Sequence, residues 1–571
     1  MLEHGFYEGL PLPDPDRLGG SVLGLQYPQL DEPPFYYLLA SLPVWLLRNS
    51  SIETQLYGAR LISLSLYLVS VVAAWGVARE LTRPENPIRI IVPLTAALLP
   101  GFTDLMTAVN NDVGAVAVFS LFLWGSVRLV RLGFSLRGLL WVVFTAAACY
   151  WTKSTAFIAV PLSALVILLA WVRGARRKWV WVLLLVGGLL STIGVLSLED
   201  AAYWYRSTSQ KIPTRARDPL APLGEHVLQL DVAAEVTPRW LRPLYQPIPL
   251  DDVAELQGKR VTFGVWMWAA RPGSVSTSVE VRTPVLTTES QDLFDIVSIS
   301  ETPTFYAFAG DLAENTTRLW ITLAPARGQS RQFTVFYDGF VLVEGEYPVT
   351  DVPAFFDAEG RQGTWGEQLF QNLVRNPSIE QAWPHIRPRF DDLGAKILPD
   401  NTRPSMLLSS LLDWQGAGWY YRFTGQNMLQ TFWGRFGWGH VTLIGPNPYL
   451  WLGIITNAGI VGAGLFLARK WRSLPGDNLI LLGLVLVGVW GAAFSRGSIF
   501  IFTRKLFIPG ARYAYPAIAP TLLLLAAGWQ ELMGYLNRWL RAPLKAQYMV
   551  YLLGFLILDI ISLITITHFY G

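Results

Sequence analysis

Apolar segments separated by short loops constrain this chain most, because about 20 consecutive apolar residues are favoured as a membrane-spanning helix. Ten apolar segments occur, several of them shorter than this, at residues 58–78, 90–106, 113–130, 138–151, 155–172, 179–198, 448–468, 479–495, 513–533 and 548–567. Composition agrees, since 52% of the residues are hydrophobic and only 15% are charged, against about 25% in soluble domains. We therefore predict a polytopic α-helical membrane protein with ten spans, of which one or two short ones are alternatively re-entrant.

The loops between these segments alternate in basic content. Lysine and arginine gather in every second loop, at Arg79, Arg83, Arg89, Arg128, Arg131, Arg137, Arg173, Arg176, Arg177, Lys178, Arg469, Lys470, Arg472, Arg538, Arg541 and Lys545. The positive-inside rule makes these loops cytoplasmic. It places the N-terminal segment and a long insert, residues 199–447, outside a plasma membrane that the chain crosses many times. The net charge of +3, without a long basic run, gives no indication of nucleic-acid binding.

The insert is long enough to bury a core of its own. Residues 258–270, "GKRVTFGVWMWAA", alternate apolar and other side chains as a strand does, and 274–283 and 331–345 repeat the pattern. We predict an extracytoplasmic antiparallel β-sandwich over 199–350. A mixed connecting region follows over 351–447, with short helices predicted at 364–374 and 404–414. The membrane domain then has two parts, 58–198 and 448–571, preceded by an outer segment, 1–57, with an interfacial helix.

Three phrases of the insert, "QGKRVTFGVWMWA", "YDGFVLVEG" and "NLVRNPSIEQAW", resemble carbohydrate-binding modules of the jelly-roll, galactose-binding-like type. The last phrase usually opens such a module and here follows the other strands, so the order is permuted or the match is incomplete. The resemblance implies that exposed aromatic rings stack on sugars. The candidates are Trp266, Trp268, Trp320 and Tyr337; alternatively, these side chains fill the core of the sandwich.

The membrane part carries six phrases in a fixed order: "EPPFYYLLASLPVWLL", "ARLISLSLYLVSVVAAWGVAREL", "AVNNDVGAVAVFSLFLW", "YWTKSTAFIAVPLSALVIL", "TFWGRFGWGHVTL" and "ARYAYPAIAPTLLLLAAG". This order resembles the C-type (GT-C) integral-membrane glycosyltransferases, nearest to the protein O-mannosyltransferase and lipid A aminoarabinose transferase branches. The resemblance implies transfer of a sugar from a polyprenyl phosphate carrier to a glycan, lipid or protein acceptor at the outer membrane face. Those branches include metal-independent enzymes, and the sequence has no convincing metal-ligand spacing, so we expect no metal or cofactor.

Asp31 and Glu32, directly before Pro33 and an aromatic run, are the candidate catalytic base, because the resembling enzymes use an outer-loop carboxylate. Alternatively, the pair only favours a helix start. The resembling proteins begin with a spanning helix before their acidic pair, and this chain begins after that point. The base therefore lies at Asp31 and Glu32 or before Met1, or the protein is inactive.

Candidate ligands of the donor phosphate are basic residues predicted to lie outside. The outer loop 496–512 has four of them, Arg496, Arg504, Lys505 and Arg512, against the positive-inside trend. Arginine holds phosphate oxygens bidentately, although lipid headgroups would explain the same charges. Lys153 in "TKS" matches a position that contacts the carrier phosphate in the resembling enzymes. A salt bridge of Lys153 to Asp112 or Asp104 is the alternative.

Candidate substrate-binding residues are Tyr36, Asn111, Asp112, His440 and Tyr513. The "VNND" phrase, residues 109–112, either orients the acceptor or caps the helix that comes after it. His440 is either a proton-transfer group or a structural residue. Two other functions stay open: a noncatalytic glycan-binding or cell-envelope assembly protein that keeps the fold, and a transporter, for which no inverted repeat is visible.

Overall fold

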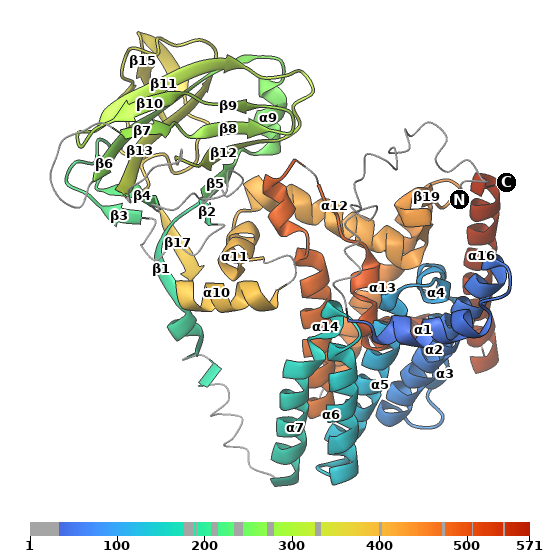
Figure 1. Ribbon diagram of the computed structural model, residues 1–571. Helices are drawn as coiled ribbons and strands as arrows, with labels where there is room; N and C mark the ends of the chain where they lie inside the picture. Colours follow the sequence, from blue (N-terminus) through green and yellow to red (C-terminus); the bar gives the residue numbers. More distant parts are fainter. Residues whose placement is uncertain are drawn as a thin grey trace. The chain divides into compact units, whose positions relative to one another are not determined.

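The computed structural model describes residues 33–175, 187–188, 191–206, 215–232, 244–270, 279–325, 333–398, 402–470, 474–504, 506–540 and 543–570. The chain divides into two compact units (Figure 1). The helical unit comprises residues 1–174, 436–486 and 515–571. The sandwich unit comprises residues 175–435 and 487–514.

The helical unit is built from long apolar helices. Its helices are α1 (Phe35–Leu46), α2 (Ile52–Leu81), α3 (Ile88–Leu98), α4 (Pro100–Thr107), α5 (Asn111–Leu132), α6 (Leu136–Tyr150), α7 (Ala159–Ala175), α13 (Pro448–Lys470), the first part of α14 (Gly476–Ser495), α15 (Ile518–Leu540) and α16 (Leu544–Tyr570). Within the described residues, 7 helices are long and apolar enough to cross a membrane, or 8 if the bent pair α3 and α4 is one span. These helices indicate a membrane protein.

The helices begin and end where local chemistry dictates. Ser51, Asn110 and Ser135 cap α2, α5 and α6, because each side-chain oxygen accepts a hydrogen bond from the backbone N–H three residues on. The bend of 59° between α3 and α4 falls at Leu99, whose backbone is extended because the next residue, Pro100, disfavours a helical conformation there.

Nine of the ten predicted spans fall on helices of the structure, although 138–151 corresponds to α6, which has only 15 residues, and 90–106 to the bent pair. The tenth, 179–198, is described over half of its length, at 187–188 and 191–198, of which 187–188 and 191–195 are helical. Its last three residues belong to strand β1 (Leu196–Ala201), which pairs with β17 (Ala382–Ile386). The predicted segment therefore extends too far, because an apolar run alone does not separate the end of a helix from the start of a strand.

Glycines let α13 and α15 approach each other closely. A Cβ atom on Gly528 would lie 1.7 Å from the carbonyl oxygen of Gly459, and one on Gly462 would lie 2.2 Å from that of Gly528. Small residues at such contacts are a common way for helices to pack in membranes, where backbone proximity replaces hydrophobic driving force. Nearby, the Trp529 indole N–H donates to the Ile455 carbonyl across the same pair, at 2.8 Å.

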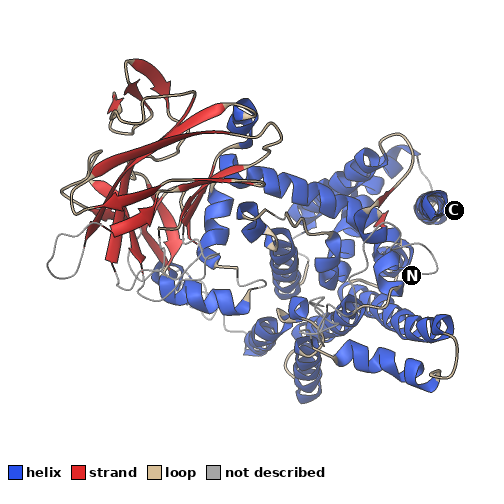
Figure 2. Ribbon diagram, turned by 45° about the horizontal axis from the view of Figure 1, so that its top comes forward, coloured by secondary structure: helices blue, strands red, loops and turns tan. Residues whose placement is uncertain are grey.

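The sandwich unit contains two five-stranded antiparallel sheets, ordered β11-β6-β13-β4-β3 and β2-β5-β12-β8-β9, and the strands gather together in Figure 2, where they are red. Their bounds are β2 (Tyr205–Arg206), β3 (Arg215–Arg217), β4 (His226–Val232), β5 (Leu244–Pro247), β6 (Arg260–Ala270), β8 (Val285–Thr288), β9 (Asp292–Leu293), β11 (Thr304–Asp311), β12 (Leu319–Leu323) and β13 (Phe333–Glu344). Smaller sheets are formed by β7 (Val279–Arg282) with β10 (Ile296–Ile299) and by β14 (Ala354–Phe355), β15 (Gln362–Trp365) and β16 (Gln368–Gln371).

The alternating residues of the sequence form the core between the two large sheets. Val261, Phe263, Val265 and Met267 of β6 are all buried there, as the period-2 pattern predicts, and β7 and β13 lie in the other two segments predicted as strands. Tyr337 belongs to the same core, and Trp268 and Trp320 are only 2% exposed. For these three aromatics, burial inside the protein is therefore the right alternative, because a buried ring cannot stack on a sugar. Trp266 is partly exposed and packs edge-on against Phe305.

The helix predicted over residues 364–374 is wrong. The segment forms the hairpin of β15 and β16, in which Trp365 pairs with Gln368. The two turn residues, Gly366 and Glu367, both have positive φ angles, as a two-residue type I′ hairpin requires. Trp365 anchors the hairpin, since its buried indole donates to the carbonyls of Pro348 and Asp351. The helix predicted over 404–414 is confirmed as α11 (Pro404–Leu412).

The helices of the sandwich unit are α9 (Leu250–Leu256), α10 (Pro388–Ile397), α11 and α12 (Trp414–Trp433). Asp413 connects α12 to the strands of the sandwich. The buried Asp413 carboxylate caps α12 at the Gly416 N–H and forms an ion pair with Arg375. It also accepts a hydrogen bond from the Tyr205 hydroxyl at 2.9 Å. Burial, with the nearby Asp413 charge, raises the pKa of Tyr205, so this hydroxyl stays a donor.

A segment distant in sequence, residues 487–514, belongs to the same compact unit. The Phe502 ring contacts Tyr205 and Tyr245, with centroids 4.8 and 4.9 Å apart. The Arg318 guanidinium donates to the carbonyls of Ile501 and Arg504, at 3.4 and 3.2 Å. The end of the α14 span is thus attached to the sandwich, and this segment carries the basic residues singled out in the sequence.

Candidate functional site

Two of these basic residues contact the same aromatic ring, and we call Arg496, Tyr513 and Arg512 the cation cluster. The guanidinium carbons of Arg496 and Arg512 lie 4.5 and 4.7 Å from the centroid of the Tyr513 ring. Arg512 also donates a hydrogen bond to the Tyr513 hydroxyl, at 2.6 Å. All three side chains are partly exposed, so a ligand from solution or from a membrane surface can reach them.

Helix α12 holds the chain that carries Arg512 and Tyr513. Asn427 donates to the carbonyls of Ile508 and Pro509, and the Thr431 hydroxyl accepts from the Ala511 N–H at 2.8 Å. These two side chains are one helical turn apart and therefore lie on the same face. Two hydrogen-bonding side chains of a regular helix thus fix the loop, which keeps the position of the cluster independent of a ligand.

Gly497 allows the other side of the loop to close. A Cβ atom at this position would lie 2.4 Å from the Tyr420 hydroxyl oxygen and 2.5 Å from the Phe507 carbonyl oxygen. Only glycine therefore fits directly after Arg496, where the end of α14 meets the returning chain.

The charges of the cluster favour an anionic ligand. Two like charges around one ring repel each other, and the repulsion grows as water is excluded. Within the described residues, Arg496 has no ion-pair partner, and its guanidinium contact is the face of Tyr513. An anion that accepts hydrogen bonds from both guanidinium groups would remove the repulsion and add charge-assisted hydrogen bonds. The arrangement suits a phosphate.

Arg504 and Lys505, the other two basic residues of the loop, are not part of the cation cluster. The Arg504 guanidinium points to Asp292 of β9, with an N to O distance of 3.4 Å, and is half exposed. The structure thus gives Arg504 a partner in the sandwich, whereas Arg496 and Arg512 meet at Tyr513. Lys505 lies outside the described residues.

In the helical unit, Lys153 pairs with two residues at the start of α5. Its ammonium lies 2.9 Å from the Asp112 carboxylate and donates to the Asn111 side-chain oxygen at 2.8 Å. All three residues are buried, with Lys153 9% exposed. The salt bridge to Asp112 that the sequence left open is present, and a buried lysine needs such a partner.

The polar residues of the "VNND" phrase have two different roles, helix capping and pairing with Lys153. Asn110 is the N-cap of α5, its side-chain oxygen accepting from the Val113 N–H at 3.3 Å. Asn111 and Asp112 instead serve Lys153, and the Asn111 amide nitrogen is buried without a partner in the described part of the chain. Capping therefore accounts for one of the three polar residues.

Of the remaining candidates, Tyr36 lies beside the first turn of α5, because a Cβ atom on Gly114 would be 3.0 Å from the Tyr36 Cβ atom. Tyr36 of α1 is fully buried, and its hydroxyl lies 2.8 Å from the Ser63 hydroxyl of α2. His440 is exposed in the loop after α12. Asp31 and Glu32 lie outside the described residues, so their catalytic role stays a prediction. Among the side chains that the structure describes, no three His, Cys, Asp or Glu gather as metal ligands do.

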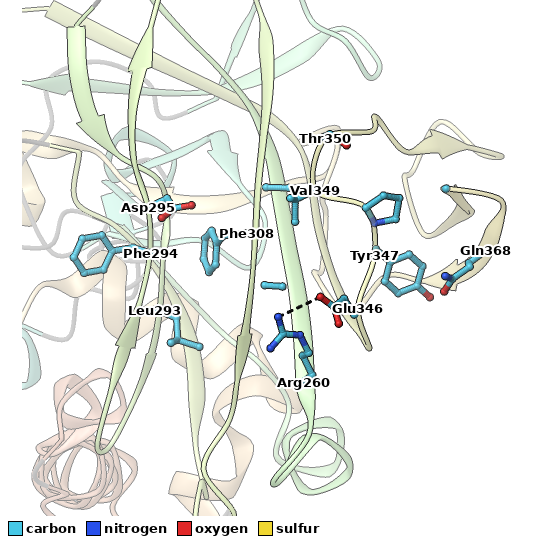
Figure 3. Close-up of a pocket in the computed structure, with 14 residues that line it drawn as sticks. Arg260, Leu293, Phe294, Asp295, Phe308, Glu346, Tyr347, Val349, Thr350 and Gln368 are labelled. Atoms are coloured by element: carbon cyan, nitrogen blue, oxygen red, sulfur yellow. Dashed lines mark hydrogen bonds and ion pairs between the residues drawn. The ribbon is translucent and has the colours of Figure 1, made fainter.

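The sandwich has a surface pocket of its own, with a cavity volume of about 830 Å³. Figure 3 shows Phe294 and Phe308 on one side of an Arg260–Glu346 ion pair and Tyr347 with Gln368 on the other. The side-chain hydrogen bond to Asp311 and the charge of Glu346 raise the pKa of Arg260, which therefore stays charged.

The pocket combines apolar rings with carboxylates, an amide and a guanidinium. Such a lining suits a polar ligand with apolar faces, because the rings cover C–H surfaces while the polar groups fix hydroxyls. Tyr347 is held by the Trp365 ring, 5.5 Å away, and by its own hydroxyl donating to the Leu369 carbonyl. Sequence reasoning missed this pocket, because Tyr347 and Gln368 lie in the loop and hairpin after the last predicted strand.

Comparisons with known proteins identify no family for this chain. No family model matches it, and no curated protein matches it. A solved structure described as "CBM4 structure and function" covers 25% of this chain and 95% of its own, with 12% identity and a TM-score of 0.18. A TM-score and an identity of this size carry no inference about function. The function proposed for this chain therefore rests on its own residues.

Proposed function

We propose that this protein is a membrane glycosyltransferase that moves a sugar from a polyprenyl phosphate carrier to a glycan, lipid or protein acceptor. The observation that carries the proposal is the cation cluster: two arginines whose guanidinium groups both contact the Tyr513 ring, at the end of a membrane-length helix. A lipid carrier brings its phosphate to the membrane boundary, where a cation pair held by regular structure can bind it. The order of the six sequence phrases supports the same reading.

The chemistry further requires a base for the acceptor, and we assign it to Asp31 or Glu32. Transfer of the sugar breaks the bond between its anomeric carbon and the carrier phosphate, forms a bond to the acceptor oxygen and releases the acceptor proton to the carboxylate. The carrier phosphate leaves as an anion, which the cation cluster stabilises.

Asp31→Asn and Glu32→Gln remove the base while keeping the shape of the side chain. One of them is expected to lower transfer at least about 100-fold, within the range of general base catalysis, with donor binding unchanged. The measurement is transfer from polyprenyl-phosphate-linked sugars by the purified full-length protein. Full activity of the double variant would remove the pair as the base and leave it as a helix-start feature.

We further propose that the chain crosses the membrane ten times and that its sandwich, with a jelly-roll-like arrangement, is extracytoplasmic. The alternating basic loops support this placement. Because the chain's one cysteine, Cys149, is buried, cysteines introduced elsewhere can be labelled selectively.

An exposed cysteine at Ala358 in the sandwich unit is expected to react with a membrane-impermeant reagent in intact cells. A cysteine at the exposed Glu85, between α2 and α3, serves as the matched control and should react only after permeabilisation. The reverse pattern would invert the topology and with it the side on which transfer occurs.

We propose that the sandwich pocket binds a glycan and that this glycan is the acceptor of the transferred sugar. Tyr347→Ala removes the ring beside the Arg260–Glu346 pair and is expected to weaken binding of an oligosaccharide by about 10-fold or more, a typical loss for one aromatic contact. The control is Tyr306→Ala, because Tyr306 is a partly exposed tyrosine of β11 that does not line the pocket. Equal losses would show that the pocket is not the binding site.

A noncatalytic glycan-binding protein of the cell envelope is the second candidate. The sandwich pocket favours it, because glycan binding there needs neither the cation cluster nor a base. The two functions differ in one assay: binding of oligosaccharide by the full-length protein without transfer from any polyprenyl-phosphate-linked sugar supports the second candidate.

A further inference from the structure

A second cavity lies in the helical unit, between α5 and α6, and is lined by none of the residues assigned to sugar transfer. The two helices pack against each other and meet at a tight turn, where Gly133 with a φ of 89° ends α5 and Ser135 caps α6. The cavity has a volume of about 420 Å³. Its polar lining includes Arg128, Ser135 and Arg137.

The apolar lining of this cavity is fixed by two contacts between glycine and tryptophan. The Trp124 ring lies on Gly76 of α2, and the Trp141 ring lies on Gly125 of α5, so closely that a Cβ atom on either glycine would come within 2.5 Å of the ring. Trp141 is further held by an indole hydrogen bond to the Leu121 carbonyl. Leu129 and Leu132 also line the cavity. Arg128 lies one turn from Trp124 and one turn from Leu132 on α5, and Arg137 lies one turn from Trp141 on α6, so each helix presents a guanidinium group beside apolar side chains.

The arginines that line the cavity carry more positive charge than the neighbouring carboxylate neutralises. The buried Glu80 carboxylate lies 2.8 Å from the Arg131 guanidinium and 3.6 Å from that of Arg128. The ion pair with Arg128 is therefore the weaker of the two. In the described part of the protein, Arg137 has no ion-pair partner. Arg128 and Arg131 thus share one carboxylate, Arg137 adds a further positive charge, and both arginines that line the cavity, Arg128 and Arg137, are exposed.

We propose that this cavity binds an anionic phospholipid, with the phosphate between Arg128 and Arg137 and the glycerol and first acyl carbons against Trp124, Leu132 and Trp141. Amphiphilic shape and charge both support this ligand: a free phosphate would leave the apolar wall exposed to water, whereas a zwitterionic lipid would bring its own cation to the arginines. Basic pockets between helices at the membrane boundary are suited to anionic headgroups. The site would bind a structural lipid and is independent of the proposed sugar transfer.

The test is lipid binding to the purified full-length protein in detergent, measured by native mass spectrometry with didecanoyl phosphatidylglycerol. Arg137→Gln and Arg128→Gln are each expected to weaken binding about fivefold, the factor that corresponds to ~1 kcal/mol for one arginine near a headgroup. Arg137→Lys, which keeps the charge, should retain most of the binding.

Arg83→Gln is the matched control, since Arg83 is an exposed arginine in a nearby loop that does not line the cavity, and it should bind like the unchanged protein. Leu132→Ser separates the two possible sources of phosphate: it should weaken the lipid and leave inorganic phosphate unaffected. The proposal fails if phosphatidylcholine binds equally well, if Arg83→Gln loses as much as Arg137→Gln, or if inorganic phosphate competes at the concentration of the lipid.

Discussion

Alanine in place of Arg496 or Arg512 is expected to weaken donor binding by about 10- to 100-fold. Each substitution removes charge-assisted hydrogen bonds to a phosphate, which contribute about 1.5 to 3 kcal/mol, and tenfold in affinity corresponds to ~1.4 kcal/mol. The two guanidinium groups meet at one ring, so the double variant should lose less than the sum of the single effects. The measurement is binding of a polyprenyl-phosphate-linked sugar to the purified protein.

Two variants of the same loop serve as controls. Arg504→Ala removes an equal charge, but its guanidinium faces Asp292 at 3.4 Å and is half exposed, so donor affinity should change less than about threefold, as for a surface ion pair. Tyr513→Phe keeps the ring that both arginines contact and removes only the hydroxyl that accepts from Arg512, so most of the affinity should remain. If Arg504→Ala weakens binding as much as Arg496→Ala, the loop acts through general lipid contacts, and the cation cluster is no donor site.

The sequence allowed the strands of the sandwich to be predicted where one face is buried. In β6, four alternating side chains enter the core, and burial of one face is the cause of a period of two. The hairpin at 364–374 was missed for a local reason: Leu369, Phe370 and Val374 are spaced as on a helix, whereas Gly366 and Glu367 adopt the turn that reverses the chain. In the sequence, Gly366 directly after Trp365 was the available signal for a turn.

Part of the candidate site could be predicted as well. The excess of basic residues in 496–512, a predicted outer loop, singled out the segment in which Arg496, Arg512 and Tyr513 come together in the structure. The partners could not be foreseen. Arg504 meets Asp292 more than 200 positions away, and Arg318 holds the backbone of the same segment. Such contacts depend on the fold of the unit and leave no trace in local composition.

The attachment of residues 487–514 to the sandwich is the clearest long-range result. In the sequence this segment belongs to the second membrane part, whereas in the structure its Phe502 ring packs between Tyr205 and Tyr245. The end of a membrane-length helix, the cation cluster and the sandwich pocket are therefore parts of one compact unit. A domain boundary inferred from hydropathy cannot reveal this arrangement. Hydropathy indicates whether a segment lies in a membrane or in water, but not which other segments it contacts.

Lys153→Met is expected to lower the free energy of unfolding by about 3 to 5 kcal/mol, because it leaves the Asp112 carboxylate buried without its cation. Lys153 and Asp112 are both buried and lie 2.9 Å apart. The double variant, Lys153→Met with Asp112→Leu, should recover most of the loss, since two apolar side chains replace the pair. Chemical unfolding of the purified protein, followed by tryptophan fluorescence, gives both values.

The matched control is Lys259→Met, which breaks an exposed ion pair with Glu344 and should cost at most about 1 kcal/mol. A loss of similar size for Lys153→Met would mean that the buried pair contributes little to stability. The double variant also separates the two roles of Lys153. If it folds and still transfers sugar, the lysine serves only to stabilise the start of α5 through Asp112 and Asn111. If it folds and binds donor weakly, the ammonium also contacts the carrier phosphate, because restoring stability then fails to restore donor binding. Loss of transfer with donor binding intact would instead point to Asp112, the candidate substrate-binding residue that this variant also removes.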